Sequence, residues 1–391
     1  MKVCIDKIEL KKAVGVSKNY LPAKPLVEVD GHILFDVKEG TVVISATDNQ
    51  QACFIELSII ESEGIGKFSC DPKRLEKALA KTNCISVMLE HDDVEMGLKV
   101  GSNEERDSFI TLHTLPISRM SVYKPALVGD NCSAEMNRKV FYTGIKYIQA
   151  FTPHRSAVSK KFDFAIINNG ILYAANGVNK RGYFVCREMQ GLQNVCIQKK
   201  FLETLGRSLN TMLCDKVTLT ERNNVISVES DDGSCKIYMT KSRYLPPEMP
   251  KQYIKVKGDP YTVVVRDQMI KSIDRSTVAS YAKLGTPMGV QLTLSGTGSD
   301  SKLKTDMITN TLKTIDTIPC ERVADDEGEE ITNLIEYKLF KTILSSFSKE
   351  GETRLYINQP EVRFFKVYTK AEIEDISFAE IGVGSYSRRV R

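Results

Sequence analysis

DPKRLEKALAKT, residues 71–82, is the stretch of sequence on which the fold prediction depends. Its apolar residues Leu75, Ala78 and Leu79 recur at helical spacing, and three lysines and an arginine occupy other positions of the stretch. This pattern predicts an amphipathic helix with one face in a core and a cationic face opposite.

Two further stretches share this pattern: IQKKFLETLGRS at 197–208 and IEYKLFKTILSS at 335–346. A strand-like run precedes the first two copies, and one follows each copy. The copies lie roughly 130 residues apart, which is a domain-sized period rather than that of a solenoid. The sequence therefore predicts three repeated domains.

A chain of 391 residues suits this division, since domains usually contain roughly 100–200 residues. The predicted domains are 1–122, 123–250 and 251–391. Each is predicted to be α+β, with two helices packed on antiparallel β-sheets. Residues 304–318, KTDMITNTLKTIDTI, fit a helix and strands alike by periodicity, and their position in the repeat favours strands.

The composition is that of an ordinary globular protein, with 42% apolar and 27% charged residues. No apolar run approaches the ~20 residues of a membrane helix, and the N-terminus has no signal-peptide pattern, so we expect a cytoplasmic protein. The ten cysteines form no C-x-x-C pair and suggest buried, reduced thiols. The four histidines lack metal-ligand spacing, so neither a metal nor a cofactor is expected.

The net charge of +4 is too small to indicate nucleic-acid binding by itself, but positive charge is concentrated on the predicted helices. One interpretation is that these are solvated helix faces, and the other is that they bind nucleic acid. The repetition of the bias in three domains favours binding. The candidate DNA-binding residues on helices are Lys11, Lys12, Lys73, Arg74, Lys77, Arg138, Lys139, Lys146, Lys199, Lys200, Arg207, Lys271, Arg275, Lys338 and Lys341.

Catalytic motifs are missing from the sequence. GIGKF at 64–68 is too short for a phosphate-binding loop, and no H-E-x-x-H occurs. His91-Asp92-Asp93 is better interpreted as the polar tip of a hairpin than as a metal or acid–base site. We therefore expect a protein without enzymatic activity and without catalytic residues.

Four segments resemble bacterial DNA polymerase III β sliding clamps: SATD at 45–48, FITLHTLP at 109–116, YAANGVNKRGYFVC at 173–186 and RYLPPEMP at 243–250. The resemblance runs through the whole chain and is weakest in the third domain. It implies a ring-forming, head-to-tail homodimer in which the helices line a hole that encircles duplex DNA without reading its sequence. It also implies two loop residues that touch DNA, Lys24 and Arg155.

The resemblance further implies a replication processivity factor. Its partners would be a replicative DNA polymerase, held through a peptide-binding pocket, and an ATP-dependent clamp loader, with no membrane partner. The pocket residues carried over are Phe162, Ala175, Gly177, Val178, Pro246, Ile381 and Val383. The candidate dimer-interface residues are Ile110, Leu112, Tyr281 and Ala282.

Two departures from the family pattern concern the pocket. Gly177-Val178-Asn179 stands where the family has glycine-histidine-arginine, and the chain ends in a longer GVGSYSRRVR. These differences would suit a divergent, phage-encoded member with another motif preference. Two alternative functions remain open at this point: a monomeric scaffold with the clamp fold but no ring closure, and a nucleic-acid-processing enzyme.

Overall fold

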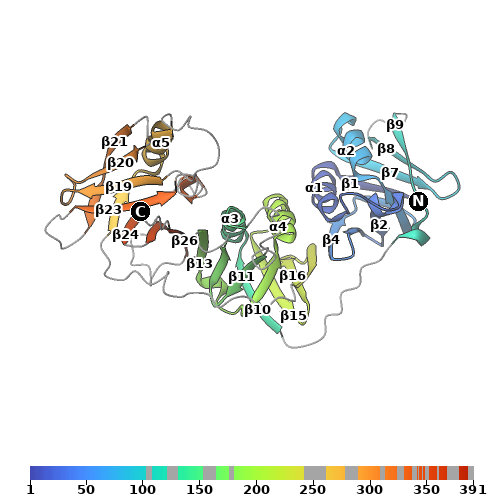
Figure 1. The fold of residues 1–391 in the computed structure, drawn as a ribbon. Coiled ribbons are helices and arrows are strands. Elements are labelled where there is room, and N and C mark those ends of the chain that lie inside the picture. Colours follow the sequence, from blue (N-terminus) through green and yellow to red (C-terminus); the bar gives the residue numbers. More distant parts are fainter. Residues whose placement is uncertain are drawn as a thin grey trace. The chain divides into compact units, whose positions relative to one another are not determined.

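The computed structural model divides into two compact units, one formed by Met1–Tyr142 with Lys200–Arg243 and the other by Thr143–Lys199 with Tyr244–Arg391. Figure 1 shows the helices and strands of both units. The residues that the structure describes are 1–102, 108–120, 131–152, 164–175, 180–241, 261–277, 289–308, 313–323, 330–336, 341, 343–345, 347, 352–358, 361–367 and 378–385.

The first unit contains a five-stranded antiparallel sheet in the order β5-β1-β7-β8-β9. Alternation of buried and exposed residues, as in β7, places one face of this sheet in the core. Its strands are β1 (Lys2–Asp6), β5 (Glu61–Glu63), β7 (Ser86–Asp92), β8 (Gly97–Ser102) and β9 (Phe109–His113).

The second sheet of this unit has eight antiparallel strands in the order β10-β15-β16-β17-β4-β3-β2-β6. Strands from either side of the predicted boundary at residue 122 meet in it, where Ile237 of β17 lies opposite Cys53 of β4. Its strands are β2 (Ile33–Val37), β3 (Thr41–Thr47), β4 (Gln51–Ser58), β6 (Gly66–Cys70), β10 (Asn131–Asn137), β15 (Lys216–Arg222), β16 (Val225–Ser230) and β17 (Cys235–Thr240).

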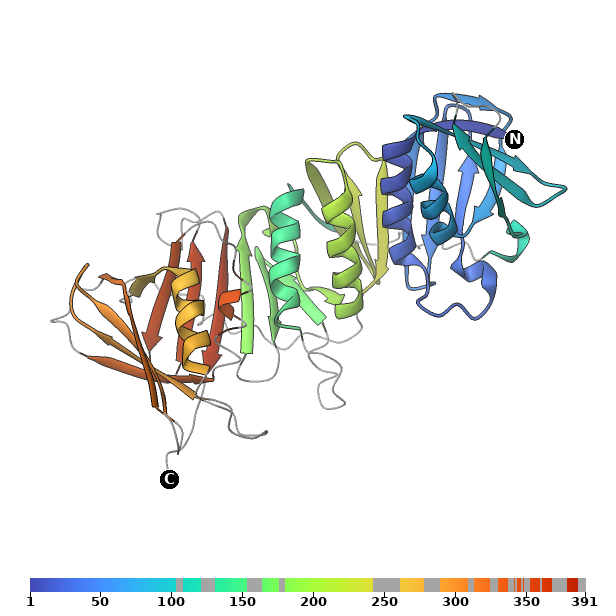
Figure 2. The ribbon, with the colours of Figure 1, turned by 90° about the horizontal axis from the view of Figure 1, so that it is seen from above.

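Helices α1 (Lys7–Ser17) and α2 (Pro72–Lys81) lie side by side, as Figure 2 shows in blue. An aspartate caps each one: Asp6 accepts the N–H groups of residues 8 and 9, and Asp71 those of residues 73 and 74. Proline at the first position of α2 is pre-organised for a helix start. These caps explain why α1 begins directly after Asp6 and α2 directly after Asp71.

The buried face of α2 contains Leu75 and Leu79, both fully covered, so the predicted apolar stripe is confirmed. Helix α4 (Lys199–Thr211) buries Phe201, Leu202 and Leu205 in the same way. Four short 3-10 helices are also described: η1 (Lys18–Tyr20), η2 (Glu28–Gly31), η3 (Ile117–Arg119) and η5 (Arg187–Met189).

The second unit contains a nine-stranded antiparallel sheet in the order β14-β11-β12-β13-β26-β25-β24-β18-β22, and a four-stranded sheet in the order β21-β20-β19-β23. The strands of the larger sheet are β11 (Phe164–Asn168), β12 (Ile171–Ala175), β13 (Lys180–Cys186), β14 (Val195–Gln198), β18 (Tyr261–Val264), β22 (Glu321–Val323), β24 (Glu352–Asn358), β25 (Glu361–Val367) and β26 (Phe378–Ser385). Those of the smaller sheet are β19 (Gly289–Ser295), β20 (Lys302–Ile308), β21 (Lys313–Pro319) and β23 (Ile331–Glu336).

Helix α5 (Arg266–Thr277) packs on β20 and β21, and helix α3 (Arg138–Gln149) ends close to β13. There the Phe151 ring leaves no room for a side chain at Gly182, because an added Cβ would lie 2.3 Å from it. Among the described residues, no helix is long and apolar enough to cross a membrane.

Residues 302–308 and 313–319 form strands, which confirms the prediction made from their place in the repeat. The predicted start of the third helical stretch, at residue 335, is wrong. Ile335 and Glu336 are the last residues of β23, paired with Val290 and Gly289. Strand pairing therefore includes the first two residues of this copy, as it includes Ile197 and Gln198 in the second copy.

One pairing pattern recurs in the two long sheets. In the first unit β17 pairs with β4, and in the second β26 pairs with β13. In each pair, one strand is the last strand of its repeat, namely β17 or β26. The other belongs to the preceding repeat and is the third strand that follows the first helix there, namely β4 after α1 or β13 after α3. Strands β9 and β21 hold the equivalent positions at the two ends of the series. In the described part of the chain, each of these has a neighbour on one side only.

Candidate nucleic-acid interface

Cationic residues cover the outward face of the α1–α2 pair. Lys11 of α1 and Lys73, Arg74 and Lys77 of α2 are exposed, and Lys12 is half-buried. The buried residues of each helix point the other way, into the sheets. Both predicted helices of the first repeat thus present the expected positive face to solvent.

A cavity of about 800 Å³ brings cations from two predicted domains together. Its lining includes Lys7, Lys11, Lys12 and Lys18 from the first repeat and Arg207 from α4. No aspartate or glutamate contributes to this lining. Lys18 is paired with the Glu76 carboxylate at 2.5 Å. The other four cations raise the local potential, and a polyanion would relieve their mutual repulsion.

Three of the helical cations hold neighbouring helices rather than point into solvent. Lys7 donates to the carbonyl oxygen of Thr82, which ends α2. Arg138 donates to the carbonyls of Cys214 and Leu209, at 2.7 and 2.5 Å. In each case the first residue of the first helix of a repeat meets the carbonyl end of the second helix, where a helix favours positive charge.

The same contact occurs in the third repeat, where Arg266 donates to the carbonyls of Leu344 and Ser345 at 2.9 and 3.3 Å. We call this repeated contact the helix latch, formed by Lys7, Arg138 and Arg266. Arg138 is among the DNA-binding candidates predicted from the sequence, because a sequence shows its charge but not the hydrogen bonds that it donates. The signal that it missed was a basic residue at the first position of the first helix in all three repeats.

Several other candidate cations have partners of their own. Arg74 lies 3.5 Å from the Asp71 carboxylate, and Arg275 lies 2.7 Å from that of Asp316. Lys341 donates to Asp274, so this pair links α5 to the second helix of its repeat. Lys200 contacts the side chain of Gln50 and lies over the Phe201 ring. Exposed ion pairs of this kind weaken a positive field without removing it.

A second group of candidates has no carboxylate within ion-pair distance among the described residues. Its members lie on five helices and one loop, and their charge remains available to a ligand. They are Lys11, Lys12, Lys24, Lys73, Lys77, Lys146, Arg207 and Lys271. Lys139 and Lys199 lie in the first turns of α3 and α4. Arg155 and Lys338 fall outside the described residues.

The edge strand β9 carries the first interface candidates. Leu112 is buried and Ile110 half-buried, because both point toward the core of their own domain. The exposed positions are instead Phe109, Thr111 and His113, and Phe109 leaves 52% of its surface in solvent. The Lys99 ammonium lies 5.3 Å from the centre of its ring. Sequence alternation shows two faces in FITLH but not which one is free. Tyr281 and Ala282 lie outside the described residues.

Of the proposed peptide-pocket residues, Ala175 is buried at the end of β12. Ile381 and Val383 belong to β26, opposite Tyr183 and Arg181 of β13. The backbone thus brings the hairpin end of repeat two and the last strand that the structure describes into one sheet. Phe162, Gly177, Val178 and Pro246 fall outside the described residues.

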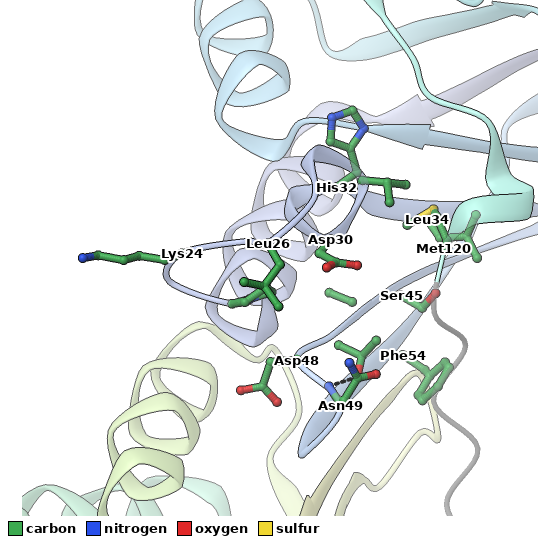
Figure 3. Close-up of a pocket in the computed structure, with 14 residues that line it drawn as sticks. Lys24, Leu26, Asp30, His32, Leu34, Ser45, Asp48, Asn49, Phe54 and Met120 are labelled. Carbon is green, nitrogen blue, oxygen red and sulfur yellow. Dashed lines mark hydrogen bonds between the residues drawn. The ribbon is translucent and has the colours of Figure 1, made fainter.

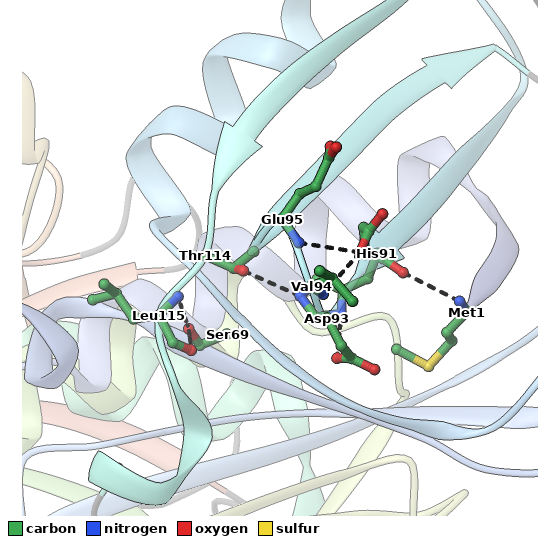
Figure 4. A network of polar contacts seen from close by, with 9 residues as sticks. Met1, Ser69, His91, Asp93, Val94, Glu95, Thr114 and Leu115 are labelled. Atoms are coloured by element: carbon green, nitrogen blue, oxygen red, sulfur yellow. Dashed lines mark hydrogen bonds and ion pairs between the residues drawn. The ribbon is translucent and has the colours of Figure 1, made fainter.

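His91 lies at the centre of a buried polar network near the N-terminus (Figure 4). Its Nε2 is 3.1 Å from the Thr114 hydroxyl, its carbonyl accepts from the Met1 amino group at 3.1 Å, and Asp93 lies 3.1 Å from Nδ1. Burial lowers the pKa of His91, and the nearby Asp93 carboxylate opposes this effect. The Asp92 carboxylate accepts the N–H groups of the following turn, which suits the predicted hairpin tip.

The cysteines behave as the sequence suggests. All ten are free thiols and eight are buried. Burial raises the pKa of the Cys53 and Cys70 thiols to about 12, which keeps them protonated and unreactive at neutral pH. Within the described part of the chain, no group of three or more histidine, cysteine, aspartate or glutamate residues is placed to hold a metal ion.

Solved structures of bacterial clamps resemble the chain over its whole length. A DNA polymerase III β subunit from Thermotoga maritima shares 15% identity, covers 99% of both chains and gives a TM-score of 0.76. The ligand-bound DNA polymerase sliding clamp from Pseudomonas aeruginosa has 14% identity, covers 99% of this chain and all of its own, and gives 0.77. The sliding clamp from Bartonella birtlesii bound to griselimycin has 16% identity, covers 99% of both chains and gives 0.75.

No protein-family model and no curated protein sequence matches the chain. The fold is therefore recognised by structure where sequence identity is low. The resemblance to DNA polymerase III β sliding clamps noted in the sequence is confirmed at the level of the fold.

Proposed function

We propose that the chain is a DNA sliding clamp, a processivity factor that encircles duplex DNA as a head-to-tail dimer. The observation that carries the proposal is the pairing pattern of the repeats. Each internal joint uses a last strand and a third sheet strand, and one strand of each kind, β9 and β21, is left at an edge. A second copy of the chain supplies the partner for each, so the contact is heterologous and two joints close a ring.

Both internal joints have the same register. Equivalent positions in the repeats are counted from the residue that precedes each helix. Asn137 and Val265 precede the first helices of repeats two and three. Asp71 and Gln198 precede the second helices of repeats one and two. In the first joint Lys236 lies opposite Phe54, and in the second the equivalent residues Ile381 and Tyr183 lie opposite each other. A register that occurs twice in one chain is a basis for expecting it a third time.

Applied to the free edges, this register places Phe109 of one chain opposite Ile315 of the other. Traced across the paired strands β8 and β7 toward the start of α1, Phe109 holds the position that Lys236 holds in its own repeat. Traced across β20 and β19 in the same way, Ile315 holds the position that Phe54 holds. Both side chains are 52% exposed in the single chain. A directly opposed apolar pair stabilises an antiparallel joint, which also pairs the unsatisfied backbone groups of two edges.

The cations without carboxylate partners supply the DNA contact. Lys11, Lys12 and Arg207, together with Lys73 and Lys77, offer charge without base-specific geometry, so binding would depend on salt and not on sequence. We assign Arg138 to the helix latch and not to the DNA contact. Retention on DNA would then come mainly from the closed ring, and contact with phosphates would guide sliding.

A clamp of this kind would hold a replicative polymerase through a peptide groove between β12–β13 and β26, and a separate ATP-dependent loader would open the ring. Two measurements test the proposal. Sedimentation should give about twice 43.8 kDa, and loaded protein should stay on circular DNA but leave after the DNA is cut. A single-chain mass at micromolar concentration would support the monomeric scaffold instead, and release from uncut circles would contradict encirclement.

A further inference from the structure

A cavity of about 250 Å³ lies in the first repeat, and its lining contains no residue of α1, α2 or α4. Its apolar lining includes Leu26, Val29, Leu34, Phe54 and Met120. Figure 3 shows Leu26 of the loop and Asp30 of η2 on one side, with Ser45, Asn49 and Phe54 on the other. An apolar hollow with a few convergent polar groups is the usual form of a site for a small ligand or peptide side chain.

Among the described residues of the first repeat, Leu26 is the most exposed large apolar one, with 97% of its surface in solvent. It belongs to the loop that precedes η2, and the neighbouring Val27 is 57% exposed. Exposed apolar side chains beside an apolar hollow leave surface that a partner would remove from water. The cavity alone does not identify that partner, and its charges narrow the choice.

The charged groups of the cavity favour a cationic partner. Asp30 has no ion-pair partner among the described residues, and the Asp48 carboxylate accepts only N–H donors of residues 50 and 51. Lys24 extends away from the other lining side chains (Figure 3). Burial lowers the pKa of His32, which keeps its imidazole neutral near pH 7. The lining therefore contains two carboxylates and one cation, Lys24, whose side chain extends away from the rest (Figure 3).

The position of the cavity suggests a peptide as the occupant. Thr47 ends β3 opposite Ala52, as Ala175 ends β12 opposite Arg181. Met120 follows η3 at the end of the first repeat. The cavity is thus the first-repeat counterpart of the peptide groove proposed in the second, and this part of the argument rests on the proposed function.

We propose that this cavity is a second peptide site, which binds a linear protein segment with one or two large apolar residues next to lysine or arginine. The apolar side chains fill the space between Leu26, Phe54 and Met120. The basic residue lies beside Asp30 and Asp48. Such a site would give each chain two separate attachment points, so a partner with two short segments would bind more tightly than either segment alone.

The test uses the full chain and the peptide acetyl-Gly-Leu-Leu-Arg-Arg-Gly-amide. The [¹³C]methyl signal of Met120, assigned with the variant Met120→Leu, reports the cavity directly. We expect a saturable shift, with affinity at least fivefold lower for Leu26→Ser and for Asp30→Asn. Val94→Ser is the matched control, because Val94 is 92% exposed on another part of the same domain.

Two control peptides separate the contributions. Replacing the two leucines with alanine, or the two arginines with glutamate, should each reduce the affinity at least fivefold. A silent Met120 methyl at millimolar peptide, equal affinity for the glutamate peptide, or unchanged binding in Leu26→Ser would overturn the proposal. The assay needs neither DNA nor a dimer, so a failure here is distinct from a failure of the clamp proposal.

Discussion

Replacement of Phe109 by alanine should weaken the association of two chains strongly without unfolding either one. In the single chain the ring is already 52% exposed and lies on an edge strand, so the domain core does not depend on it. In the proposed joint the ring is covered by Ile315 of a second chain. The variant therefore tests the register of the joint as well as its existence.

The size of the effect follows from the exposed area. A phenylalanine side chain buries ~200 Å² when fully covered, so the exposed half of Phe109 would lose ~100 Å² to a joint. At ~25 cal/mol per Å² this is worth ~2.5 kcal/mol per joint. Two joints close one ring, and alanine keeps part of the contact, so the loss is about 4 kcal/mol. The dissociation constant should then rise about a thousandfold.

Sedimentation velocity over a concentration series measures this constant. Ile315→Ala should have an effect of similar size, and the double variant should lose less than the sum of the two, because the residues contact each other. Val94→Ala provides a control that is more exposed than Phe109, at 92%, but lies in a hairpin turn. An unchanged dissociation constant for Phe109→Ala, or strict additivity with Ile315→Ala, would refute the register.

Three other predictions concern the helix latch, the buried histidine and the cationic face. Arg138→Ala removes two charge-assisted hydrogen bonds and should destabilise the end of α4 by about 2 kcal/mol, seen as faster amide exchange there, whereas Arg138→Lys should restore part of the protection. Burial lowers the pKa of His91, so the unfolded chain binds the proton more readily, and the free energy of unfolding should fall as pH drops below about 6.5. In urea unfolding, His91→Gln should make the free energy of unfolding less dependent on pH. An unchanged pH dependence would assign the effect to other groups. Charge reversal at Lys11 and Arg207 should shorten retention on circular DNA and reduce its salt dependence, while Lys38→Glu, on the exposed β2–β3 turn, should leave both unchanged; equal loss in all three would point to net charge alone.

Much of this fold could be predicted because local signals agree. In α2 the aspartate cap, the proline at the first position and the apolar spacing of Leu75 and Leu79 all favour the same helix. The start of the third copy failed because Ile335 and Glu336 fit a strand end as well as a helix start. Only the pairing with β19 decides between the two, and that pairing joins residues far apart in sequence.

The candidate site was harder to predict for a similar reason. Spacing in FITLH gives two faces, and hydrophobicity favoured Ile110 and Leu112 as the interface, but the sheet turns these inward and leaves Phe109 outside. A count of charges also treats Arg138 and Lys11 alike, although one donates to carbonyls and the other has no carboxylate partner among the described residues. Availability of a side chain depends on tertiary contacts.

The β17–β4 and β26–β13 joints are each formed within a single polypeptide, whose backbone keeps the separated strands near each other. The effective concentration of one strand near its partner is therefore high, and a transient separation of the two strands is quickly reversed. A β9–β21 joint has no such tether, so its lifetime depends on protein concentration and on a few exposed side chains. In the proposed ring, a loader would need to separate only the β9–β21 joints, and a small change there would alter how long the ring stays closed while the rest of the molecule keeps its stability.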